Sequence, residues 1–443
     1  MRPGVRLGGW GSFPLHETRL STPRSEAALR ERVAEGGVIA RGNGRAYGDS
    51  AVGARTVGMR GFDRMLAFDA AAGRLVAEAG VLLADVIGVF LPRGWFPFVT
   101  PGTKFVTLGG MIAADVHGKN HHKDGSLGRF VDWIDVMGPD GVVRRCSRDD
   151  NAELFEWTVG GMGLTGVILR AAIRLRPVET AWIRQTTLPA PCLEAAVDVF
   201  ERARDATYSV AWIDCLSRGD RLGRSLVMLG EHAAWTDLDE RRRWRPYDAG
   251  RRPARGVPLH APSGLLNRWT VRAFNELYYR AGVAKAGTDL VDWDSYFYPL
   301  DAILGWNRIY GRKGFVQFQC VLPLERSRDG LRRLLEAISD AGEGSFLAVL
   351  KRLGPQDGRF SFPMLGYTLA LDFPVHPRTL ALMDALDRIT IAHGGRFYLA
   401  KDGRMTADTL RRSDGRAQRF ARLRDEAGLR VGFRSAQSER LGL

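Results

Sequence analysis

The amino-acid sequence predicts an α+β protein of two domains, and three observations support this prediction. At 443 residues the chain is longer than one hydrophobic core usually supports, so two domains are expected. Helix and strand patterns alternate along residues 1–182, between loops that are rich in glycine. From residue 183 onward the strands are longer and amphipathic helices follow them, as in an antiparallel sheet covered by helices.

The first domain, residues 1–182, is predicted to begin with a helix over residues 25–35, which Gly36 ends. A short buried strand over residues 38–40 comes next. The later elements are, in chain order, a strand over 75–79, a helix over 82–91 closed by Pro92, two strands within 131–145 joined by the turn Pro139-Asp140-Gly141, a helix over 150–157, a glycine-rich turn over 160–166 and a strand over 167–175.

Residues 183–395 are predicted to form the second domain. Strands are expected over residues 209–215 and 315–322. Helices over residues 326–341 and 377–393 have one apolar face and are expected to lie on one side of the sheet. This part of the chain is therefore predicted to be an α+β cap.

Two glycine-rich loops carry the clearest functional signal. The first follows the strand over 38–40 and reads RGNGRAYGD at residues 41–49. The second runs from PGT at residues 101–103, through LGG at 108–110, to HGKNHH at 117–122. Such loops let the backbone approach a ligand and direct N–H groups toward an anion. Two of them predict a diphosphate joined to a large group, although neither matches GxGxxG or GxxxxGK[ST].

Together with TVGGMGLTG at residues 158–166, these loops resemble those of the FAD-linked oxidases of the vanillyl-alcohol-oxidase type. Within that family the chain is most similar to the enzymes that oxidise a ribose carried on a polyprenyl phosphate. The similarity runs nearly end to end and includes Gly9-Trp10-Gly11, ELYYR at 276–280, WNRIYG at 306–311, QFQ at 317–319, DFP at 372–374 and YLAKDGR at 398–404.

The resemblance implies a PCMH-type FAD-binding domain, an antiparallel-sheet substrate cap over residues 183–395, and a return of residues 396–443 to the FAD-binding domain. It implies non-covalent FAD, because residues 39–50 lack the histidine or cysteine that tethers the flavin in many relatives. The implied reaction oxidises the ribose 2′-hydroxyl to a ketone, the first half of an epimerisation that makes an arabinose donor for cell-wall arabinan. A separate NAD(P)H-dependent short-chain reductase would complete it, since this chain has no nicotinamide fingerprint.

The motif positions that match the family's FAD contacts lie in several segments of the chain. They are Arg41, Gly42, Asn43, Gly44, Arg45, Ala46, Tyr47, Gly48, Pro101, Gly102, Thr103, Thr107, Gly109, Gly110, Ala113, His117, Gly118, Asn120, His121, Gly163, Gly166, Ile168, Tyr398 and Lys401.

Lys401, Tyr47 and His117 are the candidate catalytic residues. Lys401 follows an apolar stretch, residues 397–400, that is expected to be a strand, and the family's YxAKD motif implies that it faces the substrate sugar. Burial and a neighbouring cation would lower its pKa, so that the neutral amine takes the alcohol proton. The sequence leaves open which of the three is the base. His117 and Lys119 are expected beside the flavin, where a cationic group would stabilise the anionic reduced form.

Three histidines within six residues, His117, His121 and His122, raise the question of a metal site. His121 and His122 are adjacent and point in different directions, and no carboxylate stands at the spacing of an HExxH motif. No metal site is therefore expected.

The resemblance places six residues in the substrate pocket: Tyr310, Gln317, Gln319, Lys351, Thr368 and Ala370. Gln317 and Gln319 alternate along one strand and so point to one face. Lys351 is expected either to bind a phosphate oxygen or to be a surface lysine. Mycobacterial members of the family have asparagine at Thr368, cysteine at Ala370 and tryptophan at Tyr278. These changes leave the flavin chemistry intact and leave the choice of sugar and lipid open.

The chain has a net charge of +14, and its arginines concentrate in residues 231–262, which are predicted to form a mobile basic loop. This loop is either simply solvated or binds an anionic lipid surface. In the second case each basic residue near the surface contributes about 1 kcal/mol of binding free energy. No motif of a nucleic-acid-binding fold accompanies the charge, so nucleic acid is not an expected partner. The arginines are Arg241, Arg242, Arg243, Arg245, Arg251, Arg252 and Arg255.

The four cysteines are scattered without CxxC spacing, and no stretch approaches the ~20 apolar residues of a membrane span. The N-terminus lacks the apolar core of a secretory signal. The protein is therefore expected in the cytoplasm, with peripheral membrane association left open. A soluble FAD-dependent alditol or sugar oxidase of secondary metabolism is the alternative function. A basic scaffold or nucleic-acid-binding protein with an inactive flavin fold is a third reading, which the intact Lys401, His117 and Tyr47 argue against.

Overall fold

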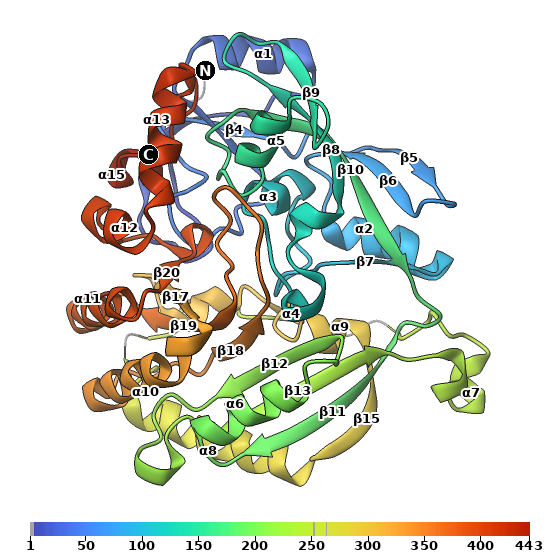
Figure 1. The fold of residues 1–443 in the computed structure, drawn as a ribbon, viewed down its shortest axis with the longest axis vertical. Coiled ribbons are helices and arrows are strands. Elements are labelled where there is room, and N and C mark those ends of the chain that lie inside the picture. Colours follow the sequence, from blue (N-terminus) through green and yellow to red (C-terminus); the bar gives the residue numbers. More distant parts are fainter. Residues whose placement is uncertain (1–3, 251–252, 263) are drawn as a thin grey trace.

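The computed structural model describes residues 4–250, 253–262 and 264–443. Two smaller sheets lie in the upper half of Figure 1, and one large antiparallel sheet lies in the lower half. The α+β class and the antiparallel sheet covered by helices, both predicted from the sequence, are confirmed.

The first sheet has the order β1-β2-β4-β3. β3 lies at the edge opposite β1 and pairs in parallel with β4. The glycine-rich loop that follows β3 is hydrogen-bonded to Trp10 and Gly11, near the start of the chain. Ser25 caps the N-terminus of α1, because its hydroxyl accepts a hydrogen bond from the Ala28 N–H at 3.2 Å. The elements are β1 (Val5–Leu7), β2 (His16–Ser21), α1 (Glu26–Ala34), β3 (Val38–Arg41) and β4 (Arg55–Gly58).

The second sheet has the order β5-β6-β10-β8-β9, and β7 also pairs with β10. Its inner face packs against α2 and α3 in a core that includes Val86, Ile112 and Ile134. The elements are β5 (Met65–Asp69), β6 (Arg74–Glu78), α2 (Leu83–Phe90), β7 (Trp95–Pro97), α3 (Leu108–Ala113), α4 (His121–Asp124), β8 (Val131–Met137), β9 (Val143–Ser147), α5 (Ala152–Thr158) and β10 (Val167–Pro177).

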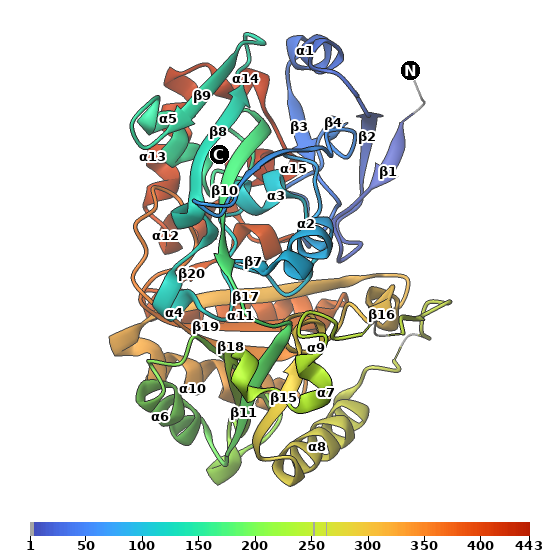
Figure 2. The same cartoon turned by 90° about the vertical axis from the view of Figure 1, so that its right-hand side faces the viewer.

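The third sheet is entirely antiparallel, with the order β15-β11-β13-β12-β18-β19-β17-β20. Helices cover one face of it, and the apolar side chains of β17 and β19 pack there against Leu331 and Leu335 of α10. The other face meets the first two sheets (Figure 2). The strands are β11 (Trp182–Ala190), β12 (Tyr208–Ile213), β13 (Ser225–His232), β15 (Gly287–Asp292), β17 (Phe315–Pro323), β18 (Ala348–Leu353), β19 (Gly366–Pro374) and β20 (Arg396–Phe397); the helices are α6 (Leu193–Arg202), α8 (Arg268–Ala284), α9 (Trp293–Phe297), α10 (Leu324–Ala341) and α11 (Pro377–Ala392).

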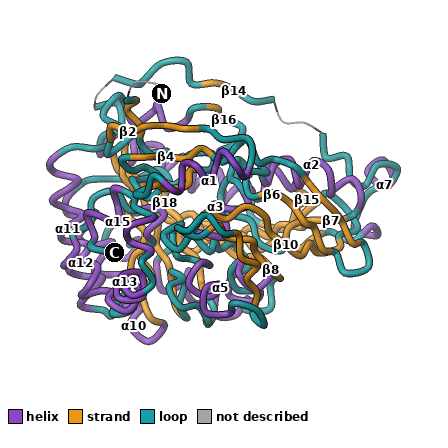
Figure 3. The backbone as a smooth tube through the Cα atoms, turned by 90° about the horizontal axis from the view of Figure 1, so that it is seen from above, coloured by secondary structure: helices purple, strands orange, loops and turns teal. Residues whose placement is uncertain are grey.

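The C-terminal helices pack against the first sheet. Phe433 forms a β-bridge with Val38, and the Arg440 guanidinium donates to the buried Asp49 carboxylate at 2.7 Å. Figure 3 shows α12, α13 and α15 gathered beside the C-terminus on one side of the molecule. The helices are α12 (Ala407–Ser413), α13 (Arg416–Glu426), α14 (Leu429–Gly432) and α15 (Ala436–Leu441).

Two local predictions need correction. The strand expected before Lys401 ends at Phe397, and residues 399–401 form a 3-10 turn because the chain leaves β17 there. Pro92 does not close α2, since a 3-10 turn, Leu91–Arg93, continues from it.

The predicted basic loop, residues 231–262, contains secondary structure. It holds the end of β13, α7 (Glu240–Arg243) and β14 (Arg255–Gly256), which pairs with β16 (Ile303–Leu304). Tyr247 donates to the Val178 carbonyl at 3.1 Å, which fixes one point of the segment to the end of β10. Arg251 and Arg252 lie outside the described residues, and the mobility of the segment stays a prediction.

Candidate functional site

The first glycine-rich loop is held by backbone contacts on both sides. Trp10 N–H donates to the Ala46 carbonyl at 2.7 Å, and Tyr47 N–H donates to the Ala400 carbonyl at 3.0 Å. A Cβ on Gly48 would lie 1.9 Å from the Asp402 carbonyl oxygen, so only glycine lets the loop approach the turn that carries Lys401. Gly44 has φ +64°, the left-handed conformation that glycine adopts freely.

The second loop touches the first through Thr107. A Cβ on Gly42 would lie 2.1 Å from the Thr107 hydroxyl oxygen, which accepts from the Gly110 N–H at 3.3 Å and caps α3. The Asn43 amide donates to the Phe105 carbonyl at 2.8 Å. The predicted residues from 41–48 and from 107–113 are therefore brought together, and the N-terminus of α3 lies beside the first loop.

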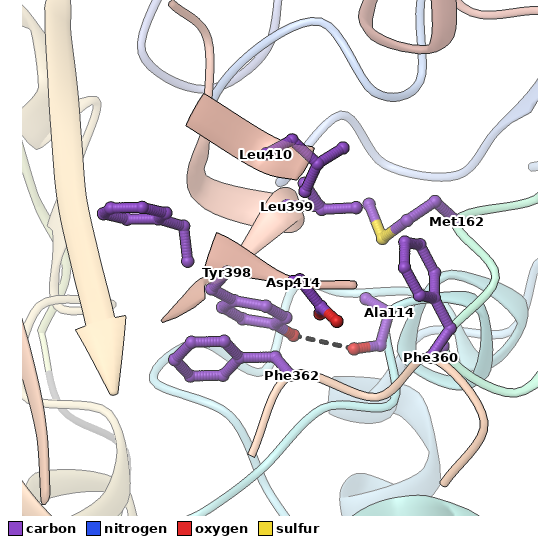
Figure 4. Close-up of a pocket in the computed structure, with 10 residues that line it drawn as sticks. Ala114, Met162, Phe360, Phe362, Tyr398, Leu399, Leu410 and Asp414 are labelled. Atoms are coloured by element: carbon purple, nitrogen blue, oxygen red, sulfur yellow. Dashed lines mark hydrogen bonds between the residues drawn. The ribbon is translucent and has the colours of Figure 1, made fainter. Parts of the chain in front are cut away.

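The glycine-rich turn before β10 lies against the same region. Gly163 has φ +76°, and Met162 N–H donates to the Ala113 carbonyl at 2.8 Å. The Tyr398 hydroxyl donates to the Ala114 carbonyl at 3.0 Å, and its ring stacks on Phe362 at 4.7 Å between centroids. Figure 4 shows Ala114, Met162, Tyr398 and Phe362 around a small cavity that is lined mostly by apolar side chains.

One face of the third sheet supplies the polar side chains of the site. The cross-strand pairs Gln317 with Asp372, Gln319 with Ala370, and Lys351 with Thr368 place all six side chains on that face. Their neighbours along β17 and β19, such as Phe318 and Leu371, point into the core under the helices. The alternation predicted for Gln317 and Gln319 is confirmed, and five of the six predicted substrate residues share this face.

Lys401 lies where this face meets the first loop. Its Nζ lies 3.5 Å from the centre of the Tyr47 ring. Burial lowers the pKa of Lys401 to about 7, the Asp372 carboxylate opposes this shift and the Lys351 cation adds to it. Burial also raises the pKa of Asp372, whose carboxylate accepts from the Gln317 amide. Burial raises the pKa of Tyr47 well above its usual range, and the charge of Asp372 adds to the shift.

His117 faces the same space from the second loop. The Gln319 amide donates to His117 Nε2 at 3.2 Å and also to the Thr368 hydroxyl at 3.3 Å. Burial, followed by the nearby Lys351 cation, lowers the pKa of His117 well below its usual range. The lowered pKa favours the neutral imidazole, and acceptance at Nε2 favours a proton on Nδ1. His117 therefore lies at the expected place, and a cationic group beside the flavin would have to be another side chain, such as a lysine.

Two other lysines, Lys351 and Lys119, lie near the site, but only Lys351 is on the polar sheet face. Burial lowers the pKa of Lys351 to about 8. Burial, followed by the Lys351 cation, lowers the pKa of Lys119 to about 7, and its ammonium donates to the Tyr296 carbonyl. Lys119 also lies 4.1 Å from the centre of the Tyr296 ring. Of these two, Lys351 is the one on the polar sheet face.

Three residues predicted to bind FAD or substrate make other contacts. Asn120 and His121 form hydrogen bonds within the protein, and Tyr310 is separated from Tyr47 by Phe315. The Asn120 amide donates to the Phe98 carbonyl at 2.7 Å, and the His121 ring bonds to the Gln356 side chain at 2.9 Å. Tyr310 stacks on Phe315, which in turn contacts Tyr47. Within the described part of the chain, no three His, Cys, Asp or Glu side chains could hold a metal ion.

Asp372 belongs to the site, although the sequence predicts no role for it beyond its place in the DFP motif at residues 372–374. It lies two residues after Ala370 and four after Thr368 on the same strand face, and its side chain is buried. Alternate residues of a strand face the same side, so the predicted pocket residues Thr368 and Ala370 imply that Asp372 faces the pocket as well. This spacing could have identified Asp372 from the sequence.

Known proteins resemble this chain over most of its length. Residues 20–147 match the model of a family described as an FAD binding domain. The chain is 36% identical to the decaprenylphosphoryl-β-D-ribose oxidase of Mycolicibacterium smegmatis, over 99% of this chain and 97% of that protein. It is 34% identical to an uncharacterized protein in the mprA 5′ region of Streptomyces coelicolor, over 82% of this chain and 99% of that protein. Over 33% of the chain it is 27% identical to the L-gulonolactone oxidase of Bos taurus.

The matches indicate FAD as the cofactor, and the residues present fit it. A Cβ on Gly102 would meet no atom within 4 Å, so the second loop borders open space at this point. Arg45 Nε and His117 Nδ1 are buried donors without a partner among the described residues. Such atoms are uncommon in a folded protein, and a bound group that accepts hydrogen bonds would satisfy them.

Proposed function

Because this chain belongs to the family of FAD-linked oxidases, we propose that it oxidises the 2′-hydroxyl of a polyprenylphosphoryl ribose to the ketone. The protein is an FAD-dependent oxidoreductase. The observation that carries the proposal is the cluster of Lys401, Tyr47, Asp372 and His117 between the glycine-rich loops and the polar sheet face. Asp372 and His117 are buried in it, whereas Lys401 and Tyr47 are half-buried. When bound, FAD supplies the acceptor for the hydride of the carbinol carbon.

Lys401 is the base. A base that works near neutral pH needs a pKa near 7, and only Lys401 among the three candidates has one. Tyr47 stays protonated because burial raises the pKa of its hydroxyl well above the usual range. His117 Nε2 already accepts a hydrogen bond from Gln319. The ring face of Tyr47 lies against Lys401 Nζ and stabilises the lysine while it carries the proton. The Nδ1–H of His117, which has no partner among the described residues, donates a hydrogen bond to the bound cofactor or substrate.

Lys351 binds the lipid phosphate. In a sugar 1-phosphate the phosphate is attached to the carbon next to the 2′-carbinol, so its binding group must lie close to the base. Lys351 meets this condition, since its cation lowers the pKa of both Lys401 and His117. Gln319 and Thr368 lie beside it on the same face and hydrogen-bond sugar hydroxyls.

Asp372 keeps the pKa of Lys401 from falling further. In the Asp372→Asn variant, burial and the Lys351 cation act on Lys401 without the opposing carboxylate, so its pKa falls. The amine then stays neutral at lower pH, and the acid limb of the flavin-reduction rate moves down by about 1 pH unit. Stopped-flow reduction across pH measures this. An acid limb that stays in place or moves up contradicts the role, and Asp140→Asn, at an exposed ion pair with Arg144, is the control.

FAD is held without a covalent bond. No histidine or cysteine lies in residues 39–50, and the loop is instead fixed by backbone contacts. Acid precipitation of the yellow protein is expected to leave the flavin colour in the supernatant. Colour that stays in the pellet would show a covalent link, and protein that stays colourless after FAD is added would undo the cofactor assignment.

The product ketone needs a second enzyme of the NAD(P)H-dependent short-chain reductase class if the ribose is to be epimerised. Within the described residues no helix is long and apolar enough to cross a bilayer. The competing function is the oxidation of free alditols or sugars. Measuring kcat/KM for lipid-linked and for free substrates distinguishes the two functions. Turnover of a prenylphosphoryl ribose with a kcat/KM far above that of free ribose and alditols supports the proposal, and the reverse order would replace it.

A further inference from the structure

The exposed apolar side chains of this protein are concentrated in one region. Among the described residues, eighteen large apolar side chains are exposed, and nine of them lie between residues 259 and 304. Scattered exposed apolar residues need no explanation, but a concentrated patch marks an interaction surface. The region consists of residues 253–262, 264–285, which include α8, and 302–313, and is called the docking face below.

Helix α8 presents apolar side chains to solvent along most of its length. Over its seventeen residues only Val271 and Asn275 are buried. Trp269 is 68% exposed and Leu277 is 69% exposed, and they lie on one side of the helix, two turns apart. Phe274 and Tyr278, at i and i+4, form a second exposed row. A helix that served only to cover the sheet would turn such residues inward.

The two loop segments continue this face. β14 pairs with β16, where Ile303 and Leu304 are exposed, and Arg308 donates to the Val257 carbonyl at 2.9 Å. Figure 2 shows α8 and β16 on the same side of the lower half. Phe346 joins them, since its ring lies 5.7 Å from both Phe274 and Tyr310.

The charge of the docking face is strongly basic. Residues 253–285 contain one carboxylate, Glu276, which is paired with Arg224 and Arg280, and residues 302–313 contain none. Interleaved basic and aromatic side chains suit an anionic lipid surface, where the rings enter the head-group layer and the cations meet the lipid phosphates. The basic residues are Arg255, Arg268, Arg272, Arg280, Lys285, Arg308, Arg312 and Lys313.

An aromatic path connects the docking face to the site. From Tyr47 the ring contacts run to Phe315 at 5.2 Å, then to Tyr310 at 4.5 Å. They continue through Phe346 to Phe274 on α8, each at 5.7 Å. Aromatic packing thus runs without a break from the docking face to Tyr47.

We propose that the docking face binds the surface of an anionic lipid bilayer and so presents the site to a lipid-linked substrate. The substrate part of this inference rests on the proposed function, whereas bilayer binding does not. Trp269 and Leu277 anchor the face, and its arginines supply the preference for anionic lipid.

Vesicle flotation with the full FAD-loaded chain tests the inference. The protein is expected to float with phosphatidylglycerol vesicles, to bind phosphatidylcholine vesicles weakly and to be released by salt. The Trp269→Ser/Leu277→Ser variant is expected to lose about tenfold in binding. Val142→Ser/Val431→Ser, which alters residues that are 51% and 69% exposed outside the docking face, is expected to bind like the wild type.

Two further measurements, flavin reduction by a water-soluble substrate and the oligomeric state, distinguish loss of bilayer binding from misfolding and from dimer formation. Reduction of the flavin by a short-chain, water-soluble prenylphosphoryl ribose is expected to be normal in Trp269→Ser/Leu277→Ser, which shows that the variant is folded. Binding that is equal in that variant and the wild type overturns the inference. A wild-type dimer that this variant converts to a monomer would place a second copy of the chain on the face and overturn it too. Vesicle binding without flavin reduction by any ribosyl lipid would refute the proposed function and leave the inference standing.

Discussion

The Lys401→Ala variant is expected to retain FAD and to lose about 10²–10⁴-fold in the rate at which substrate reduces the flavin. The reason is that the pKa of the half-buried Lys401 amine is brought to about 7, so it is the group able to take the alcohol proton near neutral pH. The backbone of residue 401 stays in the same turn, because Lys401 N–H donates to the Tyr398 carbonyl whatever the side chain. The measurement is anaerobic stopped-flow bleaching of the flavin.

Two comparisons make this result specific. Lys123→Ala, which removes an exposed lysine of α4, is expected to bleach at the wild-type rate. Lys401→Arg keeps the positive charge but holds no neutral amine near pH 7, so it is expected to stay slow. Normal bleaching in Lys401→Ala would remove Lys401 from the chemistry and return the question to Tyr47 and His117.

The Gly48→Ala variant is expected to bind FAD poorly and to unfold at a lower temperature. The added Cβ would lie 1.9 Å from the Asp402 carbonyl oxygen, and 2.6 Å from the Gly403 Cα, both of them backbone atoms that cannot rotate away. Separating the two segments costs about 1–3 kcal/mol and pulls the first loop away from the turn that carries Lys401. Thermal unfolding and the ratio of flavin to protein absorbance measure the two effects.

Gly88→Ala is the matched control for this variant. Gly88 lies inside α2, and a Cβ there meets no atom within 4 Å. Alanine is favoured over glycine inside a helix by roughly 1 kcal/mol, so this variant is expected to be as stable as the wild type or more so. A Gly48→Ala protein with full FAD content and an unchanged unfolding temperature would show that the close approach is not required.

The sequence predicts the parts of the site that depend on local pattern. The strand before Arg41, the glycine at position 44 and the shared face of Gln317 and Gln319 each follow from spacing or from a conformation that glycine favours. The predicted helices over 25–35 and 326–341 agree with α1 and α10 because their caps and apolar periodicity are local as well.

The parts that depend on tertiary contacts could not be predicted from the sequence. Whether His117 is charged depends on burial against the sheet and on Lys351, which lies 234 positions further along the chain. The turn at Lys401 forms because the chain must leave β17 to reach Tyr47. Asp372 gains its role only when the strand register places it beside Gln317 and near Lys401.

The most direct test of the central claim is anaerobic titration of the wild-type flavoprotein with a prenylphosphoryl-β-D-ribose and with its 2′-deoxy counterpart. The account predicts that the ribose compound bleaches the flavin and yields the 2′-ketone, while the deoxy compound binds without bleaching. Bleaching by both compounds would show that another hydroxyl is oxidised. Bleaching by neither compound, with reduction by a free alditol instead, would contradict the proposed function.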